Sequence, residues 1–91
     1  MIRINCFISV KEENREKVLE AARRLTAASL KQDGCIAYDV YESATRREVL
    51  MICETWRDKA ALDAHTASDV FHTEAGILHS DAEMKLESFE F

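Results

Sequence analysis

The sequence contains no proline and only two glycines among its 91 residues, so it has little of the composition of long loops or disordered linkers. No apolar run approaches the roughly 18 residues that a transmembrane helix needs. The first residues also lack the apolar core and cleavage site of a signal peptide. We therefore expect a single cytoplasmic domain over residues 1–91 that has no membrane partner.

Basic residues are outnumbered, with 12 lysines and arginines against 17 acidic residues, which gives a net charge of −5. They are also mixed with acidic residues along the chain rather than gathered into a basic stretch. The chain thus lacks the electrostatic footprint with which proteins attract a phosphate backbone. We expect no nucleic-acid partner.

The composition also argues against a metal ion or a cofactor. The glycines are Gly34 and Gly76, so there is no glycine-rich loop for a nucleotide or a flavin. The histidines His65, His72 and His79 recur every seven residues, and two helical residues at that spacing lie about 10.5 Å apart along the axis, too far to share one ion. Three cysteines without CxxC spacing predict reduced thiols that fill strand positions.

The apolar residues recur with two different periods along the chain. A period of two or a short apolar run predicts strands over residues 2–10, 35–42, 48–56 and 82–91. A helical period predicts helices over residues 12–33, 59–65 and 69–79. Asp58 and Ser68 are expected to cap the second and third helices, and Gly34 to end the first in a left-handed conformation.

This element order, βαββα(α)β, predicts an α+β ferredoxin-like fold, with a four-stranded antiparallel sheet covered by helices on one face. The first three strands carry large side chains at both parities: Ile4 and Phe7, Ile36 and Tyr38, Leu50 and Met51. A domain of this size buries only roughly 60 to 65% of its chain's surface. We therefore expect the open face of the sheet to pair with a second copy in a homodimer.

Four short motifs follow one another in a fixed order: Gly34-Cys35-x-x-Tyr38, Glu54-x-Trp56, Ala61-Leu62-x-Ala64-His65 and Ser68-x-x-Phe71. Together they resemble the antibiotic biosynthesis monooxygenase (ABM) domain, and the resemblance covers nearly the whole chain. It implies a dimeric α+β barrel in which two ferredoxin-like sheets face each other. It also implies an apolar pocket between the sheet and the helices of each subunit.

Members of that family differ in activity. Some resemble quinol or polyketide monooxygenases that use neither metal nor flavin, one branch degrades haem, and another isomerises a phosphorylated autoinducer. The haem-degrading branch requires an Asn on the first strand, a Trp on the second helix and a His on the third. This chain has Asn5, His65 and Ala75 at those places, so only one of the three matches. Haem degradation is not expected.

Oxygenation without a cofactor requires an electron-rich substrate, a proton acceptor, donors for the resulting anion and a dry cavity. His65 has a suitable ordinary pKa, near 6.5, to be the base, and Asn5 can donate to an oxyanion. Substrate-binding candidates are the rings of Trp56, Phe71 and Tyr38, which can enclose a flat ring, and Glu54, which shares strand parity with Trp56.

Each of these residues also has a structural interpretation. His65 can interact with the C-terminus of its own helix, and Trp56 can anchor the core. Asn5 can satisfy a neighbouring polar group, and Glu54 can belong to an ion pair. A filled core without a cavity would favour these structural roles.

Three hypotheses about function remain. The first is a homodimeric, cofactor-independent monooxygenase that uses molecular oxygen on a quinol-like or polycyclic aromatic substrate. The second is an isomerase of a small phosphorylated carbonyl compound, with Arg3 or the Arg46-Arg47 loop as a phosphate clamp. The third is a non-enzymatic small-molecule-binding or stress-response dimer.

Overall fold

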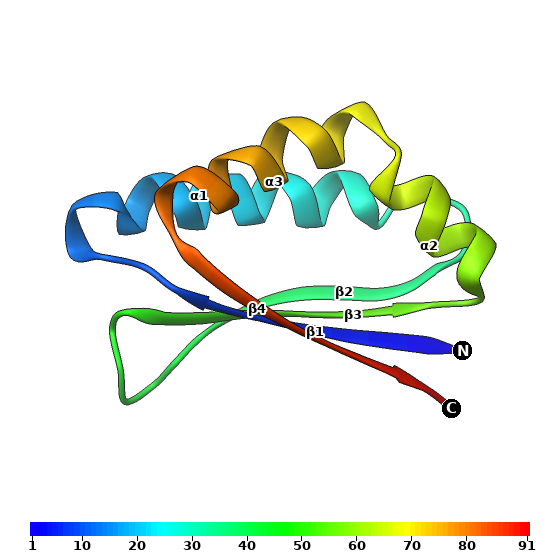
Figure 1. Ribbon diagram of the computed structural model, residues 1–91, viewed down its shortest axis with the longest axis horizontal. Coiled ribbons are helices and arrows are strands. Elements are labelled where there is room, and N and C mark those ends of the chain that lie inside the picture. The colour runs from blue at the N-terminus through cyan, green and yellow to red at the C-terminus, as the bar shows by residue number, and fades with distance from the viewer.

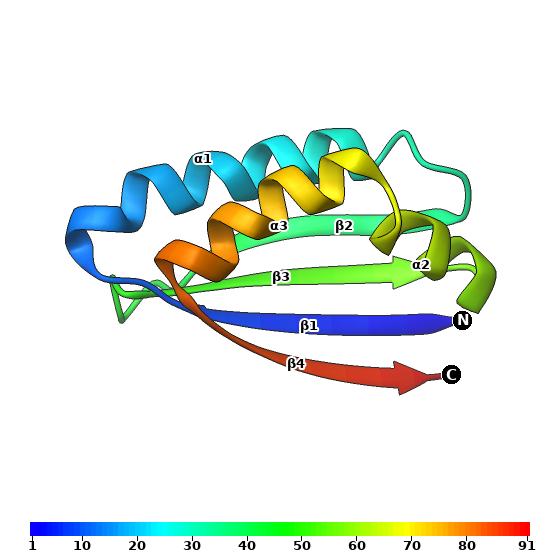
Figure 2. The same cartoon turned by 45° about the horizontal axis from the view of Figure 1, so that its top comes forward.

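The computed structural model describes all 91 residues as one antiparallel sheet with three helices on one side (Figure 1). In chain order the elements are β1 (Ile2–Ser9), α1 (Glu12–Ser29), β2 (Cys35–Glu42), β3 (Val49–Trp56), α2 (Lys59–Thr66), α3 (Asp69–Asp81) and β4 (Glu83–Glu90). The strands lie in the order β2-β3-β1-β4, which Figure 2 shows, and the termini lie side by side, with the N-terminal amine donating to the carbonyl of Phe91. The ferredoxin-like α+β fold is confirmed.

The first helix is shorter than the sequence predicts, because it ends at Ser29 and not near residue 33. The amides of Lys31 and Gln32 bond three residues back, to Ala28 and Ser29, so the chain tightens into turns before β2. Gly34 then adopts a positive φ of 82°, as expected. A short turn carrying Gln32 is thereby held beside the end of β3.

The covered face of the sheet forms the core with the helices. Cross-strand pairing sets Ile2, Cys6 and Ile8 of β1 on the same face as the even-numbered residues of β3. Among the side chains that are almost wholly buried are Leu50 and Trp56 from β3, and Val18, Leu25 and Leu78 from the helices. The apolar side chains that recur along each strand and helix therefore pack against one another between the sheet and the helices.

Side-chain caps begin the two short helices, as the sequence predicted. Asp58 accepts a hydrogen bond of 2.9 Å from the amide of Ala61. Ser68 accepts one of 3.3 Å from the amide of Phe71. These caps fix where α2 starts after β3 and where α3 turns away, and so they fix the position of His65 between them.

The cysteines are all free thiols. Cys6 is buried in the core and Cys35 packs at its margin, whereas Cys53 lies on the open face of the sheet beside Asn5. None of the three helices combines the length and apolar character needed to cross a membrane.

Candidate functional site

The end of β3 places a carboxylic acid and an indole on the covered face. Glu54 and Trp56 are two residues apart and so point to the same side, where both are buried. The indole Nε1 of Trp56 donates a hydrogen bond of 2.8 Å to Oε1 of Glu54. This bond satisfies one oxygen of a carboxyl group that burial removes from water.

The imidazole of His65 comes from the last turn of α2 and is 1% exposed. Its Nδ1 atom lies 2.7 Å from Oε1 of Gln32, in the turn after α1. Its Nε2 atom has no hydrogen-bond partner and lies 3.9 Å from Oε1 of Glu54. One ring nitrogen is therefore engaged, and the other faces a buried acid.

Aromatic rings surround this imidazole. The ring centre of His65 lies 4.5 Å from that of Trp56, 5.1 Å from that of Phe71 and 5.7 Å from that of Tyr38. The structure thus brings together five of the six predicted site residues, which we call the His65 cluster: Tyr38, Glu54, Trp56, His65 and Phe71. Within this cluster the rings are in contact with one another, so side chains fill the space between sheet and α2.

Burial shifts the ionisation of the cluster towards neutral forms. Desolvation lowers the pKa of His65 to about 4. Desolvation also raises the pKa of Glu54 above its ordinary value, although its hydrogen bonds with Trp56 and Tyr38 act against that shift. Burial, followed by the nearby charge of Glu54, raises the pKa of Tyr38 well above its usual range. The imidazole is therefore an uncharged proton acceptor at neutral pH.

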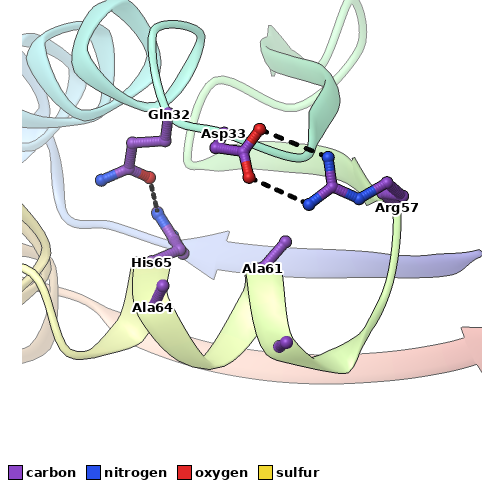
Figure 3. A pocket seen from close by; sticks show the side chains of 7 residues that line it. Gln32, Asp33, Arg57, Ala61, Ala64 and His65 are labelled. Atoms are coloured by element: carbon purple, nitrogen blue, oxygen red, sulfur yellow. Dashed lines mark hydrogen bonds and ion pairs between the residues drawn. The ribbon is translucent and has the colours of Figure 1, made fainter.

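A solvent-facing cavity of about 310 Å³ lies next to the cluster, between α2 and the turn that follows α1. Figure 3 shows the side chains of Gln32 and His65 meeting on one wall, with Asp33 and Arg57 on another. Arg57 donates to both carboxylate oxygens of Asp33, at 3.0 and 3.3 Å. Its charge is therefore compensated, and the cavity is a poor site for an anion.

Gln32 is a site residue that the sequence analysis missed. It belongs to no motif and lies 33 positions before His65, so only the folded chain shows the contact. The signal available in the sequence was weak: a lone amide two positions before Gly34, in the segment between α1 and β2.

Asn5, the predicted oxyanion donor, is not part of the His65 cluster. It pairs with Cys53 of β3 and Glu87 of β4, and so it points to the open face of the sheet. Glu54 and His65 lie on the covered face. The expectation that Asn5 and His65 line the same pocket of one chain is therefore corrected by the strand register.

The covered face is incompletely shielded beside Glu54. On the neighbouring strand, Ile4 stands opposite Glu54 and is half-buried; beyond it, Ser88 of β4 is exposed. Leu86 has the parity of the covered face, yet it is 67% exposed. Since opposed residues have Cβ atoms about 5 Å apart, Ile4, Leu86 and Ser88 form a partly apolar surface on β1 and β4 beside Glu54, which we call the shelf.

No group of three or more histidine, cysteine or carboxylate side chains is arranged to hold a metal ion. His72 and His79 are exposed on α3 and do not join His65. The cluster instead offers a neutral imidazole, a buried carboxyl group and three aromatic rings, a set suited to moving a proton beside an aromatic molecule.

Comparisons with known proteins agree with this architecture. The model of a family described as antibiotic biosynthesis monooxygenase matches residues 1–74. A crystal structure of a protein of unknown function and "Possible Oxidoreductase" from Bacteroides thetaiotaomicron is 58% identical, with a TM-score of 0.97 over 99% of this chain and 96% of that one.

Two curated relatives are also similar. The Bacillus subtilis protein "Putative monooxygenase YcnE" is 32% identical over 71 residues, which are 78% of this chain and 75% of that protein. An uncharacterised protein of Synechocystis is 34% identical over 65 residues. Those residues are 71% of this chain but only 44% of the Synechocystis protein, so the chain matches less than half of that relative's length.

Proposed function

The chain belongs to the antibiotic biosynthesis monooxygenase family, and we propose that it is a cofactor-independent monooxygenase that acts on a quinol-like or polycyclic aromatic substrate. One observation carries the proposal: the buried, uncharged His65 keeps its Nε2 atom without a partner, 3.9 Å from Glu54 and among three aromatic rings. An unpartnered polar atom at this depth is costly for stability, on the order of 1 to 3 kcal/mol, which favours a functional reason for it.

The proposed substrate lies on the shelf of β1 and β4, with its reacting edge turned towards Glu54. Ile4 and Leu86 offer apolar contact there, and a flat ring would cover the exposed part of Leu86. Proton removal by His65 leaves the substrate as an electron-rich anion. The acquired proton then faces the carboxyl of Glu54, whose Oε1 lies 3.9 Å from Nε2.

For an anthrone-like substrate the reaction balances without any further reductant. The ring methylene (CH₂) and O₂ give a ring carbonyl (C=O) and one molecule of water. The carbon loses four electrons and two hydrogens, and dioxygen gains both. The anion attacks O₂ to form a substrate hydroperoxide, which takes its proton from the His65 imidazolium. Loss of water from the hydroperoxide then breaks the O–O bond. Dry, apolar surroundings favour these steps, since water would protonate the anion.

The proposed active form is a homodimer, the assembly typical of this family. The open face of the sheet carries a row of large side chains, Tyr41, Met51 and Phe7, opposite one another on adjacent strands. Phe7 is 40% exposed and Tyr41 50%. A second copy facing this row would remove it from water and would also enclose Asn5 and Cys53.

The two other hypotheses fare differently. Of the arginines suggested for the phosphate clamp of an isomerase, Arg47 is paired with Glu12, and Arg3 donates to Thr55 and lies over the ring of Phe91. A non-enzymatic binding dimer remains the second candidate, and one observation favours it: the rings of the His65 cluster fill the space between them.

Oxygen consumption tests the proposal. The purified, metal-stripped protein is given a panel of hydroquinones and anthrone-like phenols, and uptake is compared with the autoxidation blank. The informative variant is His65→Asn, because its amide nitrogen can still donate to Gln32 while the Nε2 acceptor is lost. His72→Asn, on the exposed side of α3, is the matched control.

We expect uptake above the blank that falls by roughly 100-fold in His65→Asn, the contribution of a general base, and is unchanged in His72→Asn. Equal uptake in both variants would remove His65 from the chemistry. No uptake across the panel, together with ligand binding seen by calorimetry, would favour the non-enzymatic dimer. Oxygen uptake by Asn5→Ala tests separately whether the amide on the open face of the sheet contributes to activity.

A further inference from the structure

The side chain of Gln32 bridges two helices at the wall of the His65 cluster. Its Oε1 atom lies 2.7 Å from Nδ1 of His65, and its Nε2 atom donates to Oγ of Ser68 at 3.3 Å. His65 is in the last turn of α2, and Ser68 caps α3. The orientation of a single amide therefore links the cap of one helix to the imidazole of another.

The hydroxyl of Ser68 decides which way that amide points. It has one hydrogen, and this hydrogen is donated to the carbonyl of His65 at 2.6 Å. Towards all other neighbours the hydroxyl oxygen can only accept, which it does from the amide of Phe71 at 3.3 Å. Gln32 must therefore present its NH₂ group to Ser68 and its carbonyl oxygen to His65.

The carbonyl oxygen in turn decides the protonation of the imidazole. An amide oxygen only accepts hydrogen bonds, so Nδ1 of His65 must carry the hydrogen. A neutral imidazole has one N–H, and burial keeps this ring neutral at pH 7 by lowering its pKa to about 4. Nε2 is then left with a bare lone pair. No hydrogen-bond partner within the protein reaches it, and Oε1 of Glu54 lies 3.9 Å away.

We propose that Gln32 is a positioning residue, which acts with Ser68 to hold His65 as the Nδ1–H tautomer and so to keep Nε2 as a proton acceptor facing Glu54. The hydrogen-bond chain places the hydrogen on Nδ1, and the burial that keeps the ring neutral leaves Nε2 bare. Its catalytic meaning rests on the proposed function, in which Nε2 takes the proton of the substrate.

Nitrogen NMR tests the tautomer directly and needs no substrate. Long-range ¹H–¹⁵N spectra of the labelled protein at pH 7 distinguish a protonated ring nitrogen from a bare one. We expect His65 to show a protonated Nδ1 and a bare Nε2, whereas the exposed His72 and His79 provide references in the same spectrum. A protonated Nε2 in the wild-type protein would overturn the proposal.

Two variants at Gln32 then separate positioning from packing. Gln32→Met keeps a similar length but removes the acceptor, so the Nδ1–H preference of His65 should be lost and a protonated Nε2 should appear. Gln32→Glu restores the acceptor and adds a negative charge, so the Nδ1–H form should be kept and the pKa of His65 should rise. Asp33→Asn, next in the chain and directed at Arg57, is the matched control and should leave the His65 signals unchanged. An unaltered His65 spectrum in Gln32→Met would contradict the role of Gln32.

Activity provides the second readout. If His65 is the base, Gln32→Met should lower kcat by roughly 100-fold with little change in KM, and Gln32→Glu should recover part of it with a pH profile shifted to higher pH. A confirmed tautomer without oxygen uptake in the wild-type protein would reject the proposed oxygenase and keep the positioning role. A wild-type enzyme with uptake and the opposite tautomer would reject the positioning role alone.

Discussion

Trp56 and Glu54 point to the same side of β3, and the indole Nε1 donates a hydrogen bond of 2.8 Å to the carboxyl Oε1. Both side chains are buried, so this pair joins the one tryptophan of the chain to the acid that faces His65. The relationship makes the stability of the fold depend on the same atoms that the proposed chemistry uses.

Trp56→Phe should destabilise the protein because it removes the indole donor of Glu54 and part of the packing around His65. We expect a loss of about 1 to 3 kcal/mol in the free energy of unfolding, the cost of an unsatisfied buried polar group. Urea unfolding followed by circular dichroism at pH 7 measures it. Leu30→Ala, at an exposed position outside the sheet, is the control, and a Trp56→Phe loss no larger than that of the control would contradict the importance of the bond.

Glu54→Gln should become relatively more stable than wild type as the pH rises. Burial raises the pKa of Glu54 in the folded state, so its contribution to stability is fully present below the unfolded pKa and is lost as the pH rises through the folded value. The glutamine keeps an oxygen for Trp56 and does not ionise. Unfolding free energies measured from pH 4 to pH 8 should diverge in favour of Glu54→Gln; the control is Glu13→Gln, at an exposed position of α1.

The pH dependence that comes from His65 should have the opposite sign. Its folded pKa is depressed to about 4 from an ordinary value near 6.5, so its contribution is present above pH 6.5 and is lost as the pH falls through 4. The shift corresponds to a loss on the order of 3 kcal/mol. Acid titration of stability should show this loss in the wild-type protein and in His72→Asn. It should be missing from His65→Asn, and its persistence there would assign it to another group.

The two glycines should respond oppositely to alanine. Gly34 has a φ of 82°, and a Cβ there would lie 2.3 Å from the Cβ of Ala61, so Gly34→Ala should cost about 2 kcal/mol or more and loosen the contact between β2 and α2. Gly76 lies within α3 with open space around its Cα, so Gly76→Ala should stabilise by up to about 1 kcal/mol. Thermal unfolding of the pair measures both, and a neutral Gly34→Ala would show that the turn carrying Gln32 adapts.

The wild-type protein should be a dimer at micromolar concentration in light scattering after size exclusion. Phe7→Glu places a charge in the middle of the exposed row on the sheet and should give a monomer, because the charge would have to be buried at the interface. Leu30→Glu, an equally apolar and exposed position outside the sheet, should stay dimeric. A monomeric wild type, or a dimer that tolerates Phe7→Glu, would show that this face is not the interface.

The chain by itself determined the elements and their order, because apolar periods, the caps at Asp58 and Ser68 and the turn at Gly34 are local properties of a few adjacent residues. It also predicted that Glu54, Trp56 and His65 gather at one junction, since a strand end and the helix that follows it are neighbours in sequence. The first helix was predicted too long. The tight turns after Ser29 are made by backbone hydrogen bonds, which the pattern of apolar side chains does not reveal.

Only the tertiary structure decided which of these residues meet. Which residues of one strand share a face follows from the sequence of that strand. Which residues of two strands share a face depends on the register between the strands, and this register places Asn5 on the face opposite to Glu54. The approach of Gln32 to His65 joins residues 33 positions apart. Such contacts follow from how helices pack on the sheet, and packing is settled by the fit of the whole core rather than by any single segment.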